Sequence, residues 1–195
     1  MRKLFVVVAG GNLDAERHFE DTIQRKRTID EVRKFLPQKE VQNLEGIYHK
    51  APFIVWGAVP GEMNLKRWKS MEPGDIVLIY NKGYIRVIGE VGAKVRSREL
   101  AKYFWRETEG GQTWELIYFI VNEERVNVPF QKVNTLFGYK ADYFPRGFST
   151  INEDAVGNLF RKHGKYSKER RRPGNNYRLS NSGAIVFFNQ RAWRK

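Results

Sequence analysis

The sequence contains no cysteine and no long hydrophobic run, and both absences narrow the classes of protein it can encode. Without cysteine there can be no disulfide framework, no thiolate metal site and no cysteine nucleophile. The longest apolar runs, LFVVVAG and GAIVFF, are far shorter than the roughly 20 residues that cross a bilayer. The N-terminus also lacks the apolar region and cleavage site of a secretory signal. We therefore expect a cytoplasmic protein.

Histidine is scarce, and the common catalytic motifs are missing. The segment GEVGAK (89–94) has the wrong spacing for a phosphate-binding P-loop, and no G-x-S-x-G nucleophile turn is present. We expect no metal, no cofactor and no catalytic residue, so the chain is predicted not to be an enzyme. The three histidines follow no metal-ligand spacing and are expected at the surface or half buried: His18, His49 and His163.

A small nuclease or RNA-modifying enzyme is the catalytic alternative. Asp75 and Glu90 could hold Mg²⁺ with Lys94 nearby. The lysine follows the glutamate by four positions rather than two, so on a strand it does not share the usual register. This alternative therefore ranks third, behind two kinds of binding protein.

Positive charge is what the sequence has in excess. There are 35 Lys and Arg against 22 Asp and Glu, giving a formal net charge of +13 and a sequence pI of about 10.0. Such an excess is typical of proteins that bind a polyanion, with nucleic acid the first candidate and an anionic membrane surface the second. A chain of 195 residues is long enough for one domain with a real hydrophobic core.

Hydrophobic patterning predicts several strands, connected by hairpins and interrupted by short helices. Residues 3–9 are apolar throughout, as in a strand buried on both faces. Thr28 followed by Glu31 forms a capping-box pattern that restarts a helix expected over 14–36, and Pro37 ends it. These elements predict an α+β fold, a small curved sheet or barrel with helices packed on it. The other expected strands are 53–59, 74–80, 84–91 and 113–121, and the other expected helices lie at 64–71, at 97–105, after Pro129 and at 151–163.

The composition changes near the C-terminus. The segment RKHGKYSKERRR (161–172) contains seven Lys or Arg and one Glu, and polar, turn-rich sequence follows it. We therefore predict a nucleic-acid-binding domain over 1–164 and a basic linker or extension over 165–195. Within the extension, AIVFF (184–188) is expected to add an edge strand.

Basic residues alternate with aromatic ones in three segments: NLKRWKS, KVRSRELAKYFWR and QKVNTLFGYKADYFPRGF. Lys and Arg contact phosphates, and aromatic rings offer faces on which bases stack. This pattern, repeated in a chain of high positive charge, favours nucleic-acid binding. Trp68 is expected to anchor its short helix to the core together with Leu65, and Trp114 is expected to be a core residue.

The order of short motifs resembles the EVE and YTH branch of the PUA-like superfamily. The matching motifs, over roughly 3–160, are the first strand with its polar turn, VWGA, MNL, IVLIY, IGEV, WELIYFI and NVPF. The long basic helical insertion before VWGA and the basic tail are most similar to the N-terminal DNA-recognition domain of an archaeal McrB. That resemblance implies a PUA-like fold and a targeting role in methylation-dependent restriction. A GTPase motor and a nuclease subunit would be the partners.

The resemblance also implies a base-binding site. YTH-type domains hold a flipped N6-methyladenine in an aromatic cage, and the matching walls here are Trp56 and Trp105, with Tyr84 or Tyr103 as substitutes for the second wall. Gly11, Asn12 and Asn64 match segments near the edge of the base. Arg146 matches a phosphate-binding arginine of the family. The basic segments supply the other candidate phosphate contacts, which are Lys66, Arg67, Lys69, Arg96 and Arg98.

Two functional predictions follow. The first is a non-catalytic module that binds methylated double-stranded DNA and flips a modified base, most consistent with N6-methyladenine, into the cage. The second is a YTH-like or PUA-like reader of modified RNA, because a flipped adenine presents the same groups in both polymers. Neither prediction includes a membrane partner.

Overall fold

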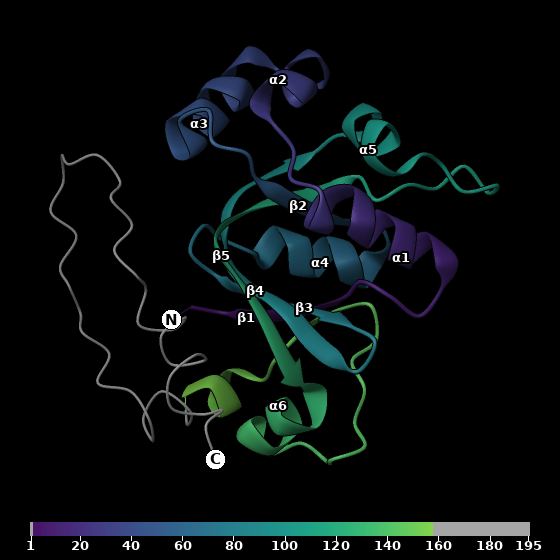
Figure 1. Ribbon diagram of the computed structural model, residues 1–195, viewed down its shortest axis with the longest axis vertical. Helices are drawn as coiled ribbons and strands as arrows, with labels where there is room; N and C mark the ends of the chain where they lie inside the picture. Colours follow the sequence, from purple (N-terminus) through teal and green to yellow (C-terminus); the bar gives the residue numbers. More distant parts are fainter. Residues whose placement is uncertain (1, 158–195) are drawn as a thin grey trace, which may run out of the picture.

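The computed structural model describes residues 2–157, which form one strongly curled six-stranded sheet surrounded by helices (Figure 1). The strand order is β2-β5-β4-β3-β1-β6; β1 pairs with β3 in parallel, and the other pairings are antiparallel. The strands are β1 (Leu4–Val8), β2 (Ile54–Ala58), β3 (Ile76–Asn81), β4 (Tyr84–Arg96), β5 (Leu116–Pro129) and β6 (Phe148–Thr150). The helices are α1 (Leu13–Phe19), the π-helix Glu20–Gln24, α2 (Ile29–Val32), the 3₁₀-helix Arg33–Phe35, α3 (Gln38–Tyr48), α4 (Glu62–Ser70), α5 (Arg98–Trp105) and α6 (Phe130–Phe137).

The sheet curls because its longest strands are irregular. The pairing of β4 with β5 shifts register at three places along β4, and each such irregularity bends and twists the strands. Gly89 lies beside one of these shifts, and a Cβ there would stand 2.4 Å from Ile120 Cγ2. The absence of a side chain therefore lets the bent strand approach its neighbour closely.

Three hydrophobic clusters pack on the sheet. The largest draws on all six strands, including Phe5 and Val7 of β1, and so lies inside the curl. Alternate residues of β1, Leu4 and Val6, belong to a second cluster under α6. The first strand is therefore buried on both faces, as its unbroken apolar run predicted.

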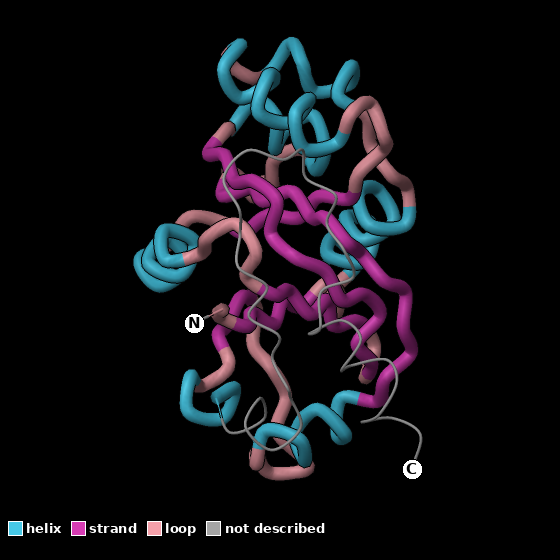
Figure 2. Tube along the Cα trace, turned by 90° about the vertical axis from the view of Figure 1, so that its left-hand side faces the viewer, coloured by secondary structure: helices cyan, strands magenta, loops and turns pink. Residues whose placement is uncertain are grey.

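The third cluster lies at the opposite end of the sheet from α6. There α2, α3 and α5 cover β2 and β5, and they contribute Val32, Leu44 and Leu100 to the buried layer. Figure 2 shows the result as a band of strands with helices at both ends.

Several predicted elements are confirmed. The Thr28–Glu31 capping box is present, with the Thr28 backbone N–H donating to Glu31 Oε2 at 2.7 Å. The hairpin, the helix at 97–105 and the helix after Pro129 also form where expected. The last described residues, 153–157, are helical within the expected range of 151–163. The boundary predicted at residue 164 and the strand predicted at 184–188 lie outside the described residues.

Two elements were not predicted. A further helix, α3, begins immediately after Pro37, because proline is compatible with a helix start although it ended the preceding helix. Strand β6 is only three residues long and forms by pairing with β1. The helical segment expected over 14–36 is interrupted before Thr28, as its capping box predicted, and Arg27 leaves the helical path there to bridge Phe53.

Candidate nucleic-acid interface

The rings of Trp56 and Trp105 are packed directly against each other. Trp56 lies on β2 inside the curl, and Trp105 is the last residue of α5. Their ring centroids are 6.1 Å apart with an interplanar angle of 65°, and each residue is 4% exposed. Neither ring presents a free face in this state, so a base can stack here only after one ring moves.

Trp105 is held by α1 and the π-helix that continues it. Its Nε1 donates to Thr22 Oγ1 at 3.2 Å, and Thr22 Oγ1 in turn donates to the His18 carbonyl at 3.0 Å. Its ring lies against Gly57, where an added Cβ would be 2.7 Å from Trp105 Cζ3. Glycine is therefore required at this position of the VWGA motif because a side chain would collide with the Trp105 ring, and not because the backbone has a conformation that only glycine adopts.

His18 belongs to this aromatic cluster and is not the surface or half-buried residue that was predicted. It is 4% exposed, its Nε2 lies 3.1 Å from the Trp105 carbonyl, and its ring meets Trp114 edge-on at 4.2 Å. Burial penalises the charged ring and lowers the pKa of His18. Its Nδ1 is buried with no hydrogen-bond partner among the described residues. The available sequence signal for its burial was its place on the helical stripe that contains Ala15 and Phe19.

Tyr118 is a second polar residue of the cluster that the sequence did not reveal. It is the register partner of Trp56 on β5, and its ring stacks on Phe148 at 5.9 Å. Its hydroxyl is fully buried and has no hydrogen-bond partner within residues 2–157. Burial raises the pKa of Tyr118 well above its usual value, so the hydroxyl stays protonated. It can therefore donate a hydrogen bond to a ligand that reaches the cluster.

The residues predicted near the base edge have local structural partners. Asn12 caps α1 by accepting from the Ala15 N–H at 2.8 Å, and Gly11 precedes it with a φ of +99°. Asn64 donates to the Val59 carbonyl at 2.9 Å. The cap lies six residues before His18, or about 9 Å along the helix axis. Helix α1 thus links the turn after β1 to the aromatic cluster.

Neither substitute for the second wall reaches the cluster. Tyr84 begins β4, whereas Lys94, the register partner of Tyr118, lies ten positions further along that strand. This separation amounts to roughly 30 Å of strand, because a strand rises about 3.3 Å per residue. Arg86 also covers the Tyr84 ring at 4.7 Å. The remaining candidate, Tyr103, stacks on Phe35 with centroids 4.7 Å apart.

The predicted phosphate contacts divide into paired and unpaired cations. Arg96 bonds Glu115 at 2.8 Å, Arg98 bonds Glu107 at 2.6 Å, and Arg67 donates to the Phe148 carbonyl at 2.7 Å. These three arginines already have hydrogen-bond partners within the domain. The predicted cations that are exposed and form no ion pair within residues 2–157 are Lys66, Lys69 and Arg146.

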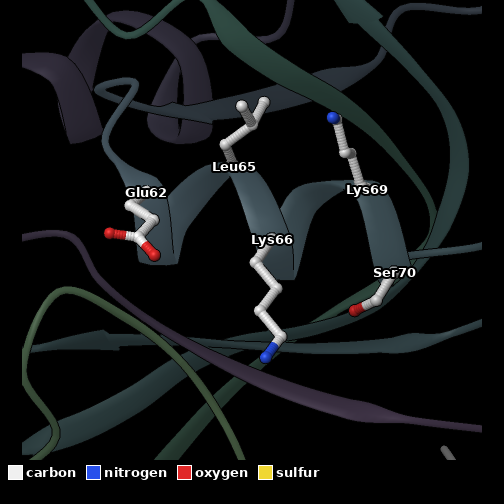
Figure 3. Close-up of a pocket in the computed structure, with 5 residues that line it drawn as sticks. All are labelled: Glu62, Leu65, Lys66, Lys69 and Ser70. Atoms are coloured by element: carbon white, nitrogen blue, oxygen red, sulfur yellow. The ribbon is translucent and has the colours of Figure 1, made fainter.

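Helix α4 presents two of these free cations beside a hollow. The hollow has a volume of about 510 Å³ and is open to solvent, and Lys66 and Lys69 project from the helix in different directions (Figure 3). The helix is fixed in place by Trp68, whose Nε1 donates to the Ile117 carbonyl at 3.1 Å. Lys94 Nζ caps its last turn through the Lys69 carbonyl at 2.9 Å. Trp68 is thus the anchor that was predicted.

The net charge is unevenly distributed along the sequence. Residues 158–195 contain 11 Lys and Arg and one Glu, so ten of the 13 net positive charges lie there. The remaining residues carry nearly balanced charge, and 11 of their Lys and Arg side chains form ion pairs. Most of the net positive charge therefore lies in the C-terminal segment, and the folded domain contributes individual cations that form no ion pair among the described residues.

Other classes of site are not supported among the described residues. No group of three or more His, Asp or Glu within residues 2–157 is arranged to hold a metal ion. No helix in the same range has the length and apolar character needed to cross a membrane. Asp75 and Glu90 have separate structural partners, the Lys3 N–H and the Arg2 guanidinium, so they do not converge with Lys94.

Comparison with known proteins identifies the fold. No protein-family model and no curated protein matches the sequence. The structure is similar to the solved N-terminal domain of Thermococcus gammatolerans McrB bound to m5C DNA, with a TM-score of 0.60 and 17% sequence identity. The similarity covers 83% of this chain and 96% of that one. The prediction from motif order is thereby confirmed for the fold: the described residues have a curled α+β fold similar to that of this McrB N-terminal domain.

Proposed function

We propose that the chain is a non-catalytic module that binds DNA and takes a methylated base out of the duplex into the Trp56–Trp105 cluster. The observation that supports this most is the fold shared with an McrB domain that was solved on m5C DNA. The chain adds its own chemistry to that likeness. The cluster combines aromatic rings with two buried polar atoms, His18 Nδ1 and the Tyr118 hydroxyl, that lack partners in the described residues.

The cluster must open to receive a base. A base stacked between two rings needs them parallel and about 7 Å apart, twice the contact distance of carbon atoms, and the present centroid separation is 6.1 Å at 65°. Trp105 is the ring expected to move, because it ends a short helix, whereas Trp56 is fixed in the pairing of β2 with β5. Its hydrogen bond to Thr22 would break in that movement.

The free energies of stacking and of base extrusion imply that binding needs both aromatic stacking and phosphate contacts. Stacking on aromatic side chains contributes about 1–3 kcal/mol per base, while unstacking a base from duplex DNA costs a few kcal/mol. Stacking alone therefore roughly balances extrusion, and phosphate contacts must provide the net affinity. Of the predicted phosphate contacts, Lys66, Lys69 and Arg146 form no ion pair within residues 2–157, and the C-terminal segment adds further charge.

Two methylated bases are candidates. N6-methyladenine follows from the YTH-like resemblance, and 5-methylcytosine follows from the DNA bound by the McrB domain of similar fold. The methyl group adds on the order of 0.8 kcal/mol when buried and about 1–3 kcal/mol when its absence leaves a poorly filled slot. Discrimination from the unmethylated base is therefore expected to be about fourfold to about 150-fold.

As a targeting module, the domain would recruit a GTPase motor and a nuclease subunit that do the cutting. The competing proposal is a reader of modified RNA, because the same cluster would accept the same base from either polymer. Both proposals place the methylated base at the same rings, so they differ only in the backbone that is bound.

Fluorescence anisotropy at fixed salt tests these proposals. The full chain is titrated into matched duplexes containing adenine, N6-methyladenine, cytosine or 5-methylcytosine, and into methylated single-stranded RNA. We expect one methylated duplex to bind most tightly and Trp56→Ala to lose that preference while keeping salt-sensitive binding. Equal affinity for methylated and plain DNA would refute the proposal that the domain recognises a methylated base.

A second variant separates binding from folding. Because Trp56 is buried, its replacement by alanine can unfold the domain, in which case the ring is established only as a core residue. Tyr118→Phe keeps the ring and removes only the unpartnered hydroxyl, so it should fold normally and weaken binding of the preferred methylated duplex. An unchanged affinity would exclude the hydroxyl from the site.

A further inference from the structure

The loop between α6 and β6, residues 138–147, is held in place by hydrogen bonds from Asn134 and Val8. Asn134 of α6 is fully buried, and its Nδ2 donates to the carbonyls of Ala141 at 3.2 Å and Tyr143 at 2.8 Å. At the end of the loop, the Gly147 carbonyl accepts from the Val8 N–H at 2.9 Å, which ties it to β1. A buried asparagine committed to loop carbonyls gives this segment a defined shape.

This supported loop presents an aromatic ring to solvent. Phe144 is 58% exposed, while the next residue, Pro145, is buried and fixes the backbone beneath it. A single exposed apolar side chain is ordinary on a protein surface. Here the ring is held on a braced loop rather than on a free one, so it is available to a ligand at little further entropic cost.

In sequence, Phe144 lies between two exposed cations, with the exposed carboxylate of Asp142 two residues before it. Lys140 and Arg146 are exposed and form no ion pair within residues 2–157. Arg67 of α4 reaches the carbonyl of Phe148, two residues after Arg146, so the loop joins the α4 surface that carries Lys66. Cations placed before and after an aromatic residue on one loop suit a nucleic-acid strand, which alternates phosphates with bases.

Resting on the proposed function, we propose that loop 138–147 is a second DNA contact, distinct from the methylated-base cluster. Phe144 stacks on a base of the bound DNA outside the cluster, and Lys140 and Arg146 bind the neighbouring phosphates. Since every base has a stacking face, this contact adds affinity without reading sequence or methylation. The loop thereby holds the duplex while the Trp56–Trp105 cluster reads the modified base.

The test measures duplex binding by the full chain with Phe144→Ala, Phe144→Leu and Phe144→Tyr. The alanine variant should bind the preferred methylated duplex and its plain counterpart about tenfold more weakly, by the same factor for both. The leucine variant should resemble it, because an aliphatic side chain does not stack, and the tyrosine variant should bind like the original chain. Asn43→Ala is the control, since Asn43 is an exposed residue on α3, at the other end of the domain (Figure 1).

The outcomes separate the two proposals. Unchanged duplex affinity in Phe144→Ala overturns the loop contact even if the methyl preference is intact. A loss confined to the methylated duplex also overturns it, because Phe144 would then belong to the reading site. If the original chain shows no methyl preference but Phe144→Ala weakens binding to plain DNA, the loop contact stands and the proposed function fails. Equal thermal midpoints for all variants confirm that an exposed side chain was changed without unfolding.

Discussion

Replacing Gly57 by alanine tests the packing on which the aromatic cluster depends. The new Cβ would lie 2.4 Å from the Trp114 carbonyl oxygen and 2.7 Å and 2.9 Å from two atoms of the Trp105 ring. Ordinary contacts begin near 3.4 Å, so either Trp105 leaves its position or β2 separates from the neighbouring backbone. Inserting a methyl group into a packed interior costs about 1–3 kcal/mol. The thermal midpoint should therefore fall by about 2–12 °C for a domain of this size.

Gly46→Ala provides a control of opposite sign. Gly46 lies on the exposed side of α3, and a Cβ there meets no atom within 4 Å. Alanine is favoured over glycine inside a helix by about 0.5–1 kcal/mol, so this variant should be slightly more stable than the original chain. Circular dichroism during heating measures both midpoints. If Gly57→Ala unfolds no earlier than the original chain, the ring of Trp105 does not occupy the space beside Gly57 and the closed cluster is refuted.

Two further predictions follow from the same structure. Lys66→Ala combined with Lys69→Ala should leave the thermal midpoint unchanged and reduce the slope of log affinity against log salt by about 0.9 for each phosphate that is no longer neutralised. Arg67→Ala should instead destabilise the domain by about 1–2 kcal/mol, because it removes the charged hydrogen bond to the Phe148 carbonyl. If the lysine variant lowers the thermal midpoint and Arg67→Ala changes only the salt slope, the lysines are structural and Arg67 is the phosphate contact. Burial lowers the pKa of His18 below its ordinary value of 6.5, so unfolded chains bind the proton more readily than folded ones. Stability from this residue is thus complete above pH 6.5 and declines as the pH falls toward the lowered pKa, and thermal midpoints measured between pH 5 and 8 should vary less in His18→Gln.

Local sequence determined those elements whose signals lie within a few residues. The capping box at Thr28 and Glu31, the hairpin around Lys82 and the helix after Pro129 all depend on neighbouring residues and all formed. Patterns of this kind predict structure because the backbone conformation and its hydrogen-bond partners are close in sequence. The fold shared with the McrB N-terminal domain was also predicted, but from the order of motifs.

Pairing between residues distant in sequence determined the features that local sequence patterns did not predict. Strand β6 has only three residues and forms through its register with β1, more than 140 positions earlier. Nothing in the local sequence distinguishes Lys66, which forms no ion pair within residues 2–157, from Arg96, whose guanidinium bonds the carboxylate of Glu115 just before the neighbouring strand β5. Ion pairing across strands depends on register, which composition does not reveal.

The sequence by itself determined the apolar strands, the capped helices and the tryptophans available to a site. Only the tertiary structure decided that Trp56 and Trp105 touch, that His18 and Tyr118 join them, and that Tyr84 does not. These residues come from α1, β2, β4, α5 and β5, and the curl of the sheet determines which of them meet. That curl arises from bulges and close glycine contacts between distant strands, so its consequences for the site appear only once the chain is folded.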